Sequence, residues 1–285
     1  MPNHSRDDLT RMFLDDGRYL RNWSSRTVST YARALTTFGE TPLTKAALSA
    51  WVIALRHRGL SVTTINILTR AVSSFLSWLH AEGLHPERLR IRQLPNPPKA
   101  IIVFSDAELR RVLTFRPTHR NQPRTWTLLV LMLDTGLRLS EALNLERRHV
   151  DLDNLVIKVL GKGHRERLVP ISLECRKHLH RLMAHTSGDL VFKTASGRGI
   201  TRHNAHRDIR RVCHVMGLDG PHIHPHAFRH CFAANYIRNG GDIYRLSRIL
   251  GHSTITTTQL YLRSMGIEHL QENHAKLSPL MMRPR

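Results

Sequence analysis

The sequence has few cysteines, few acidic residues and no long apolar run. Its three cysteines, Cys175, Cys213 and Cys231, are far apart and form no CxxC pair. This spacing argues against a disulfide framework or a zinc site and indicates buried thiols of a reducing compartment. The N-terminus has no apolar signal core, and the longest apolar run, Leu128 to Leu133, is too short to cross a bilayer. We therefore expect an intracellular, cytoplasmic protein with no membrane partner.

Acidic residues are scarce relative to basic ones. The 285 residues include 22 Asp and Glu against 43 Lys and Arg, which gives a formal net charge of +21 and a pI near 11.3. This charge exceeds what solubility needs and favours a polyanion, and counterion release makes nucleic acid the natural partner. A solubility device or a membrane-surface patch fits less well, because the basic residues are spread along the whole chain and not gathered on one amphipathic helix.

The first hundred residues show helical periodicity and predict a small helical bundle. Apolar residues recur at helical spacing in three stretches behind caps such as Thr44, and Ser5 offers a cap for an earlier helix over 9–14. The polar faces carry groups that can contact phosphates or base edges. The candidate DNA-binding residues are Arg26, Thr27, Arg33, Thr64, Asn66 and Arg70. An ordinary solvated face accounts equally well for any single one of them.

A stretch rich in proline and arginine, residues 85–98, interrupts the helical pattern. Closely spaced prolines prevent a helix, and the arginines keep the stretch in water. We interpret it as an interdomain linker and divide the chain into a first domain at 1–90, a linker at 91–100 and a second domain at 101–285. The second domain is expected to open with a helix at Ser105.

The first motif of the second domain places an arginine at a helix junction. A buried helix containing 128–133 should end at Gly136, and a new helix should begin near Ser140, so that Arg138 projects from the junction. Glu141 is close enough to hold this arginine. Taken alone, the pair is explained equally well as a surface salt bridge of little energetic value.

The second motif is a β-hairpin. Segments 155–160 and 167–171 have strand character, and Lys162 lies between two glycines at the tip. A lysine in this position can reach into a DNA groove. Most hairpin-tip lysines only increase solubility, so this motif alone is weak.

The segment 222–261 concentrates histidine, arginine and tyrosine. Pro225 fits the first position of a helix, which places His226, Arg229 and His230 on one face. A second helix over 243–250 should follow.

Asp242 can cap this second helix, and Gly251 can end it in the left-handed conformation. His252 is then presented from a tight turn, and a further helix carries Tyr261. Side chains of these types, converging in one place, suit a negatively charged tetrahedral group.

Together these motifs resemble those of the tyrosine recombinase (phage integrase) family, in the same order and with similar spacing. The matching residues are Arg138 in TGLRLSEAL, Lys162 in GKGHRERLVPI, His226 and Arg229 in PHAFRH, His252 in LGHS and Tyr261 in TTTQLY. The resemblance implies a mainly α fold with a two-domain layout like that of Xer and Cre recombinases and no additional amino-terminal domain. The N-terminal bundle would be the core-binding, SAM-like domain, and the catalytic domain would be mixed α+β with a small antiparallel sheet.

The resemblance also implies an activity, namely site-specific cleavage and rejoining of DNA through a 3′-phosphotyrosine intermediate, with chemistry like that of type IB topoisomerases. The outcome would be integration, excision or resolution, in a prokaryotic cell or on a phage or other mobile element. The expected partners are duplex DNA with inverted-repeat half-sites and further copies of the chain, from a dimer to a tetrameric synapse. A tail helix at about 265–278 would contact a neighbouring protomer, although docking on its own domain fits almost as well.

The family's chemistry assigns a role to each matching residue. Arg138 and Arg229 would hold the non-bridging phosphate oxygens, since pre-placed cations stabilise the more negative transition state. Tyr261 would be the nucleophile, and Lys162 would protonate the departing 5′-oxygen.

The remaining candidates would assist these groups. His226 would accept the tyrosine proton or hold the phosphate, and His252 would give a second hydrogen bond to the phosphate. Glu141 would orient the arginine and the histidine, and His230 would support the site or serve in packing. No metal or other cofactor is expected, because the covalent link retains the bond energy.

Other classes of protein compete for the same residues. His222, Ile223 and His224 with a tyrosine suggest the metal-dependent nicking enzymes of rolling-circle replication, and HIHPH alone suggests a metal cluster. Against this, Ala227 stands where a zinc motif of the HExxH type needs glutamate. A non-catalytic DNA-binding relative would differ only at the motif residues, and a type IB topoisomerase shares the chemistry but relaxes DNA without a partner strand.

Overall fold

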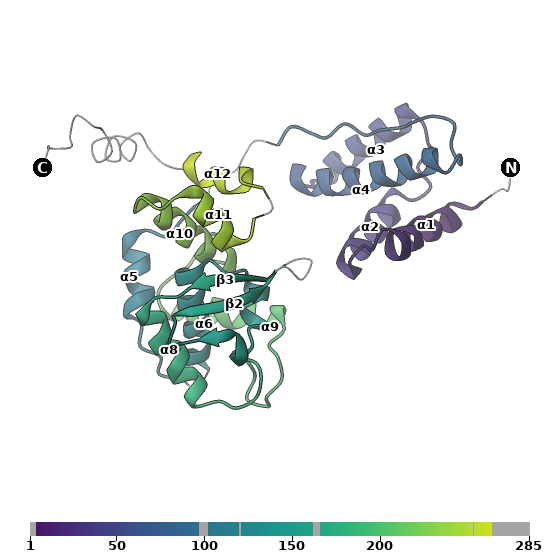
Figure 1. Cartoon of the computed structure of the whole chain (residues 1–285). Coiled ribbons are helices and arrows are strands. Elements are labelled where there is room, and N and C mark those ends of the chain that lie inside the picture. Colours follow the sequence, from purple (N-terminus) through teal and green to yellow (C-terminus); the bar gives the residue numbers. More distant parts are fainter. Residues whose placement is uncertain (1–3, 97–101, 120, 162–165, 253, 264–285) are drawn as a thin grey trace, which may run out of the picture. The chain divides into compact units, whose positions relative to one another are not determined.

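The computed structural model describes residues 4–96, 102–119, 121–161, 166–252 and 254–263. The chain forms two compact units, Met1–Lys99 and Ala100–Arg285 (Figure 1). Within the described residues, no helix has both the length and the apolar character needed to span a membrane. All three cysteines are buried free thiols, as predicted.

The first unit is a helical bundle. Its α-helices begin after Ser5, Ser24, Thr44 and Ser61, whose side-chain oxygens accept a backbone N–H of the first turn. The elements are α1 (Arg6–Asp15), the π-helix η1 (Asp16–Leu20), α2 (Ser25–Phe38), α3 (Lys45–His57) and α4 (Val62–Ala81). Phe13 lies at the centre of the core, completely buried. The early helix is longer than the predicted 9–14, because α1 begins directly after its cap Ser5 and continues to Asp15, where η1 follows.

The stretch interpreted as a linker packs on the first unit. Leu89 is 1% exposed, and Ile91 and Leu94 pack against the same core. The Asn66 side chain donates to the carbonyl of Leu94 at 2.8 Å and accepts from its N–H at 2.9 Å. Residues 85–96 therefore run along α4 as part of this unit, while 97–101 lie outside the described residues.

The second unit is built around a buried central helix. Its elements are α5 (Asp106–Thr114), α6 (Gln122–Thr135), α7 (Leu139–Leu143), the 3-10 helix η2 (Arg147–His149), β1 (Val150–Asp151), β2 (Val156–Leu160), β3 (Glu166–Pro170), α8 (Leu173–Ala184), α9 (Arg202–Val215), α10 (Pro225–Arg238), α11 (Ile243–Leu250) and α12 (Thr256–Arg263). Helix α6 packs against α8, α9 and α10. Its residues Leu128 to Met132 are buried, as predicted from the apolar run.

The sheet is antiparallel with the order β1-β2-β3. Strands β2 and β3 form the predicted hairpin, with Val156 opposite Pro170 and Leu160 opposite Glu166. The two-residue strand β1 was not predicted. The fold class is confirmed, a mainly α chain with a small antiparallel sheet.

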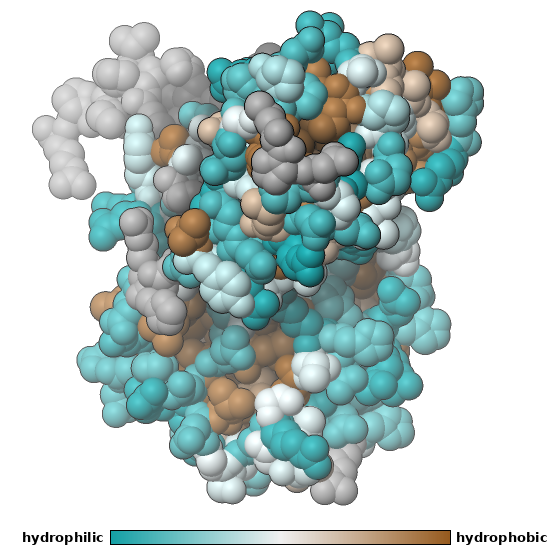
Figure 2. Space-filling model, turned by 90° about the vertical axis from the view of Figure 1, so that its right-hand side faces the viewer, coloured by the Kyte–Doolittle hydropathy of each residue, from teal (hydrophilic) through white to brown (hydrophobic). Residues whose placement is uncertain are grey.

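Helices α10, α11 and α12 pack on one another beside β3 (Figure 1). Their contact with the end of α6 requires glycine at position 136, which has φ +65°. A Cβ there would lie 2.4 Å from the Phe232 ring and 2.6 Å from the Leu250 side chain. This close approach brings the α6–α7 junction next to the end of α11. The face of the molecule in Figure 2 is mostly hydrophilic, with hydrophobic side chains in separate small groups.

Candidate active site

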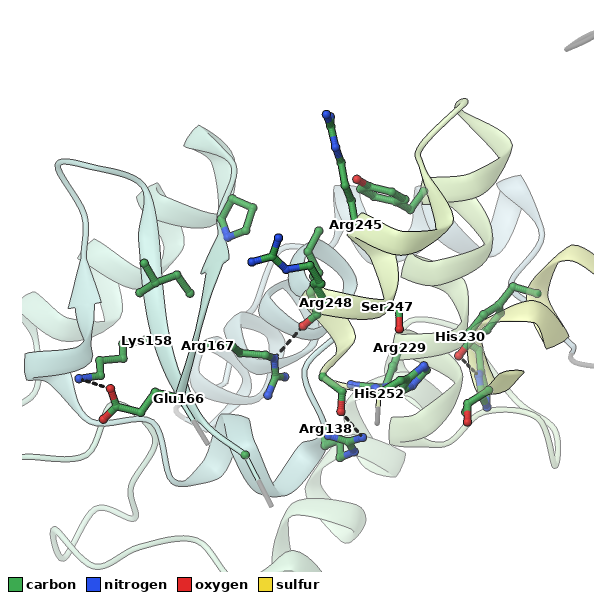
Figure 3. Close-up of a pocket in the computed structure, with 18 of the residues that line it drawn as sticks. Arg138, Lys158, Glu166, Arg167, Arg229, His230, Arg245, Ser247, Arg248 and His252 are labelled. Carbon is green, nitrogen blue, oxygen red and sulfur yellow. Dashed lines mark hydrogen bonds and ion pairs between the residues drawn. The ribbon is translucent and has the colours of Figure 1, made fainter. Parts of the chain in front are cut away.

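A pocket of about 1610 Å³ in the second unit collects most of the residues singled out in the sequence. The predicted residues that line it are Arg138, His226, Arg229, His230, His252 and Tyr261. Figure 3 shows several of these side chains pointing toward one another from different elements. Lys162 lies outside the described residues.

Arg229 is the most deeply buried charge of the pocket, with 2% of its surface exposed. It lies in the first turns of α10, which Pro225 opens as predicted. Its guanidinium donates to the carbonyls of Gly136 and Leu250, and it lies 2.9 Å from Nε2 of His252. Burial, reinforced by the nearby charge of Arg138, lowers the pKa of Arg229 to about 10. The group remains a cation at neutral pH.

Arg138 stands at the N-terminal cap of α7 with 37% of its side chain exposed. Its Nη1 donates to Glu141 at 2.8 Å, and its backbone N–H donates to the other Glu141 oxygen at 2.9 Å. Burial acts to raise the pKa of Glu141, but hydrogen bonds from Arg167 and Arg138 outweigh it and hold the pKa below its usual value. Glu141 is thus an anion that fixes arginines, as expected for Arg138.

Arg167 is a site residue that the sequence motifs did not indicate. It extends from β3 and donates to both oxygens of Glu141, at 3.1 and 2.9 Å. Its Nε donates to the carbonyl of Ile249 at 2.8 Å. This arginine belongs to the hairpin motif that contains Lys162, but its partners are 26 and 82 residues away, so no local spacing indicates them.

His252 follows the predicted turn. Asp242 caps α11, and Gly251 ends it with φ +65°. The His252 ring bridges Arg229 through Nε2 and Thr258 through Nδ1, the latter at 2.8 Å. Burial, followed by the charges of Arg229 and Arg138, lowers the pKa of His252 to about 4, so the ring is neutral at pH 7.

Tyr261 lies on α12, as predicted, and is 3% exposed. Its hydroxyl lies 2.9 Å from Nδ1 of His230. Burial, followed by the neighbouring His226, lowers the pKa of His230 to about 4, which leaves a neutral ring able to accept a proton. Burial also raises the pKa of Tyr261, against the lowering effect of Arg229.

The expectation gave the tyrosine proton to His226, whereas the described hydrogen bond joins Tyr261 to His230. The His226 and His230 rings lie side by side, with centroids 4.8 Å apart. Burial, with the charge of Arg229, lowers the pKa of His226. His226 lines the same pocket, in a position to face a bound group.

The other histidines of HIHPH have partners within the fold. His222 lies 3.1 Å from a Glu108 oxygen through Nε2, and His224 caps α10 by accepting the Ala227 N–H at its Nδ1. These contacts account for the motif without a ligand role. Among the residues that the structure describes, no group of three or more His, Cys, Asp or Glu is arranged to hold a metal ion.

Five of the six candidate DNA-binding residues of the first unit fall into two groups. Arg26, Arg33 and Arg70 are exposed. The hydroxyls of Thr27 and Thr64 pair with the capping serines of α2 and α4.

Asn66 has a role within the fold. Its side-chain amide holds the backbone of Leu94 and so attaches residues 85–96 to α4, while its contact with DNA stays a prediction.

Comparison with known proteins gives a consistent result. Residues 103–266 match the model of the Phage integrase family. The chain is 31% identical to tyrosine recombinase XerC of Xanthomonas campestris pv. campestris (strain B100) over 248 residues, which cover 85% of this chain and 76% of the relative. It is 29% identical to tyrosine recombinase XerC of Yersinia pestis over 274 residues, with 89% of each chain covered.

Solved structures share the fold. The Tn1549 transposon integrase in complex with circular intermediate DNA superposes with a TM-score of 0.79 at 19% identity, covering 95% of this chain and 99% of the other. The XerH site-specific recombinase bound to palindromic difH substrate gives 0.74 at 19% identity, with 98% and 85% covered.

Proposed function

The chain belongs to the phage integrase family, and on this premise we propose that it is a site-specific recombinase that cleaves and rejoins DNA strands through a 3′-phosphotyrosine intermediate. The observation that supports this best is the convergence of Arg138, Arg229, His252, His230 and Tyr261 on one pocket. These side chains come from four separate elements. Packing alone would not require two guanidinium groups to line the same pocket as a tyrosine.

Arg138 and Arg229 bind the non-bridging oxygens of the scissile phosphate in the proposed reaction. The phosphate becomes more negative as it is attacked, so cations already in place stabilise the transition state more than the ground state. A guanidinium has five N–H donors. Arg229 can therefore keep its two carbonyl partners and still donate to a phosphate oxygen. His226 contributes a further contact to the same phosphate. His252 does so when its Nε2 leaves Arg229 and, in the tautomer with Nε2–H, donates to a phosphate oxygen.

Tyr261 attacks the phosphorus, and its proton passes to Nδ1 of His230. A bond forms between the tyrosine oxygen and phosphorus, the bond to the 5′-oxygen breaks, and Lys162 supplies the proton that this oxygen takes up. The 5′-hydroxyl of a partner strand later reverses these steps. Because the phosphotyrosine retains the bond energy, the reaction needs no nucleotide or metal cofactor. Since Tyr261 is 3% exposed, attack requires a displacement of α12, a helix of eight residues.

The proposed partner is duplex DNA with inverted-repeat half-sites. The net charge of +21 and the exposed Arg26, Arg33 and Arg70 support contacts with the phosphate backbone. Two protomers would occupy one site, and two such sites would form a tetrameric synapse. In this scheme a tail helix at about 265–278, outside the described residues, contacts the neighbouring protomer. The protein would act in the cytoplasm, at the nucleoid or on mobile DNA.

A trapping experiment tests the proposed function. Duplexes selected from a random library by binding to the protein are incubated with it in the presence of a chelator, and covalent adducts are separated under denaturing conditions. We expect an adduct for the wild type and for Tyr244→Phe, a control because Tyr244 is 69% exposed on α11. Tyr261→Phe should form none. A 5′ adduct that appears only when metal is added would refute the proposal.

Strand exchange is tested with two marked duplexes, since supercoil relaxation alone does not distinguish a recombinase from a topoisomerase. Exchange of flanking sequences supports recombination, and relaxation without exchange contradicts it.

A further inference from the structure

Arg167 joins three elements of the active site, and this arrangement goes beyond the roles assigned above. Its side chain is 13% exposed and extends from β3 into the pocket (Figure 3). The two terminal nitrogens donate to both oxygens of Glu141, and Nε donates to the carbonyl of Ile249 in the last turn of α11. One guanidinium thus connects the hairpin to α7 and to α11.

Both partners of Arg167 lead directly to groups that would bind the phosphate. Glu141 holds Arg138 through its side chain and its backbone N–H. Beyond Ile249, the chain supplies the Leu250 carbonyl to Arg229 and then continues to His252. Arg167 therefore contacts both Glu141, which holds Arg138, and the end of α11, which holds Arg229.

The backbone leaves space for this contact at Gly251. A Cβ at this position would lie 3.0 to 3.2 Å from three atoms of the Arg167 guanidinium. The glycine, with φ +65°, thus lets the guanidinium lie against the turn that presents His252. The turn that presents His252 is thus packed against a side chain of β3.

Charge gives Arg167 a second effect on Arg138. Glu141 has two oxygens, and each accepts from Arg167 as well as from Arg138. If Arg167 were removed, the carboxylate would be left to Arg138 alone, and a bidentate arginine–carboxylate pair is strong and geometrically specific. Such a pair would draw Arg138 away from a phosphate.

We propose that Arg167 is a positioning residue, which sets the spacing between Arg138 and the Arg229–His252 pair and keeps the Arg138 guanidinium available to the scissile phosphate. This inference rests on the proposed function and deepens it. Arg167 itself does not contact the substrate in this scheme. Its effect is exerted through Glu141 and through the end of α11.

The experiment compares Arg167 with a matched buried arginine. Arg124 is 16% exposed, and it binds the Asp208 carboxylate at 2.9 Å and the Lys193 carbonyl at 3.0 Å. Its partners lie outside the candidate active site. The variants Arg167→Gln, Arg167→Lys, Arg124→Gln and Arg124→Lys therefore lose similar buried contacts, but only the first two should disturb the phosphate site. The lysine variants keep the positive charge. They provide the measurement if the glutamine variants do not fold.

Two substrates of the same sequence provide the readout. One carries the normal scissile phosphate, and the other carries a methylphosphonate, in which one non-bridging oxygen is replaced by a methyl group and the charge is removed. Adduct formation is measured in single turnover at saturating DNA, and binding and thermal unfolding are measured separately. A small misplacement of supporting groups costs about 100-fold in rate, and we expect the Arg167 variants to lose about this much on the phosphate. The ratio of variant to wild-type rate should be much closer to one on the methylphosphonate.

The outcomes separate the two proposals. A loss that is confined to the Arg167 variants and shrinks on the neutral substrate, with DNA affinity unchanged, supports the positioning role. An equal loss on both substrates, or the same loss in the Arg124 variants, overturns that role and leaves the proposed function intact. A wild-type protein that forms no adduct would overturn the proposed function and the positioning role together.

Discussion

Replacing Arg229 with lysine should affect both stability and cleavage. Arg229 is 2% exposed, and its guanidinium has three partners, the carbonyls of Gly136 and Leu250 and the ring of His252. A lysine ammonium is a compact group on a single stem and cannot reproduce this planar set of contacts. At least one buried carbonyl would lose its partner, at a cost of about 1–3 kcal/mol in the free energy of unfolding. The loss of one pre-placed donor to a transition state costs about 10²–10³-fold in rate.

Hydrogen exchange is a suitable assay for the stability effect. Three of the four tryptophans lie in the first unit, so tryptophan fluorescence does not isolate the second. Exchange of peptides from α10 and α11, measured by mass spectrometry, reports their opening directly. Arg124→Lys is the control, because it should lose comparable stability without losing adduct formation. Exchange of the α10 and α11 peptides at the wild-type rate in Arg229→Lys, or adduct formation at the wild-type rate, would contradict the role assigned to Arg229.

Three further predictions concern histidines and the first unit. The pKa values of His230 and His252 are about 4 against 6.5 for the free side chain, so the unfolded state binds more protons between these values. Stability in urea should therefore fall as the pH drops from about 6.5 to 4, and a slope unchanged in a His230→Asn, His252→Asn double variant would contradict this. His230→Asn should lower the rate of adduct formation at pH 7 by about 10²–10⁴-fold, the usual contribution of a general base. The control His214→Asn, at an exposed position, should leave this rate unchanged. Equal rates for His230→Asn and the wild type would exclude His230 as the proton acceptor. Asn66→Ala should destabilise the first unit through the loss of two hydrogen bonds, each worth about 0.5–1.5 kcal/mol, as measured by tryptophan fluorescence. A selective change in base preference at unchanged stability would instead restore the DNA-reading role for Asn66.

The sequence predicted features that depend on neighbouring residues. Pro225 at the start of α10, Asp242 at the cap of α11 and the left-handed Gly251 all lie where local backbone rules place them. The alternating strands likewise predicted the β2–β3 hairpin. In each case the energetic reason lies within a few residues, so spacing alone was sufficient.

Features that depend on tertiary contacts were missed. The partners of Arg167 lie on α7 and α11, and the Asn66 amide binds Leu94 across 28 residues. His230 was expected to support or to pack, because helical spacing cannot show that its Nδ1 lies next to the Tyr261 hydroxyl. The proline-rich stretch was interpreted as a linker for a similar reason. Its local pattern excludes a helix, but it does not show that Leu89 is buried against the first unit.

In the proposed reaction, the Tyr261 hydroxyl attacks a phosphate held by Arg138 and Arg229. The most direct test of this step is to digest the trapped DNA adduct with protease and nuclease and to identify the modified peptide by mass spectrometry. We expect a 3′-phosphoryl nucleotide linked to the oxygen of Tyr261. A nucleotide attached to any other residue, or to Tyr261 through a 5′-phosphate, would contradict it.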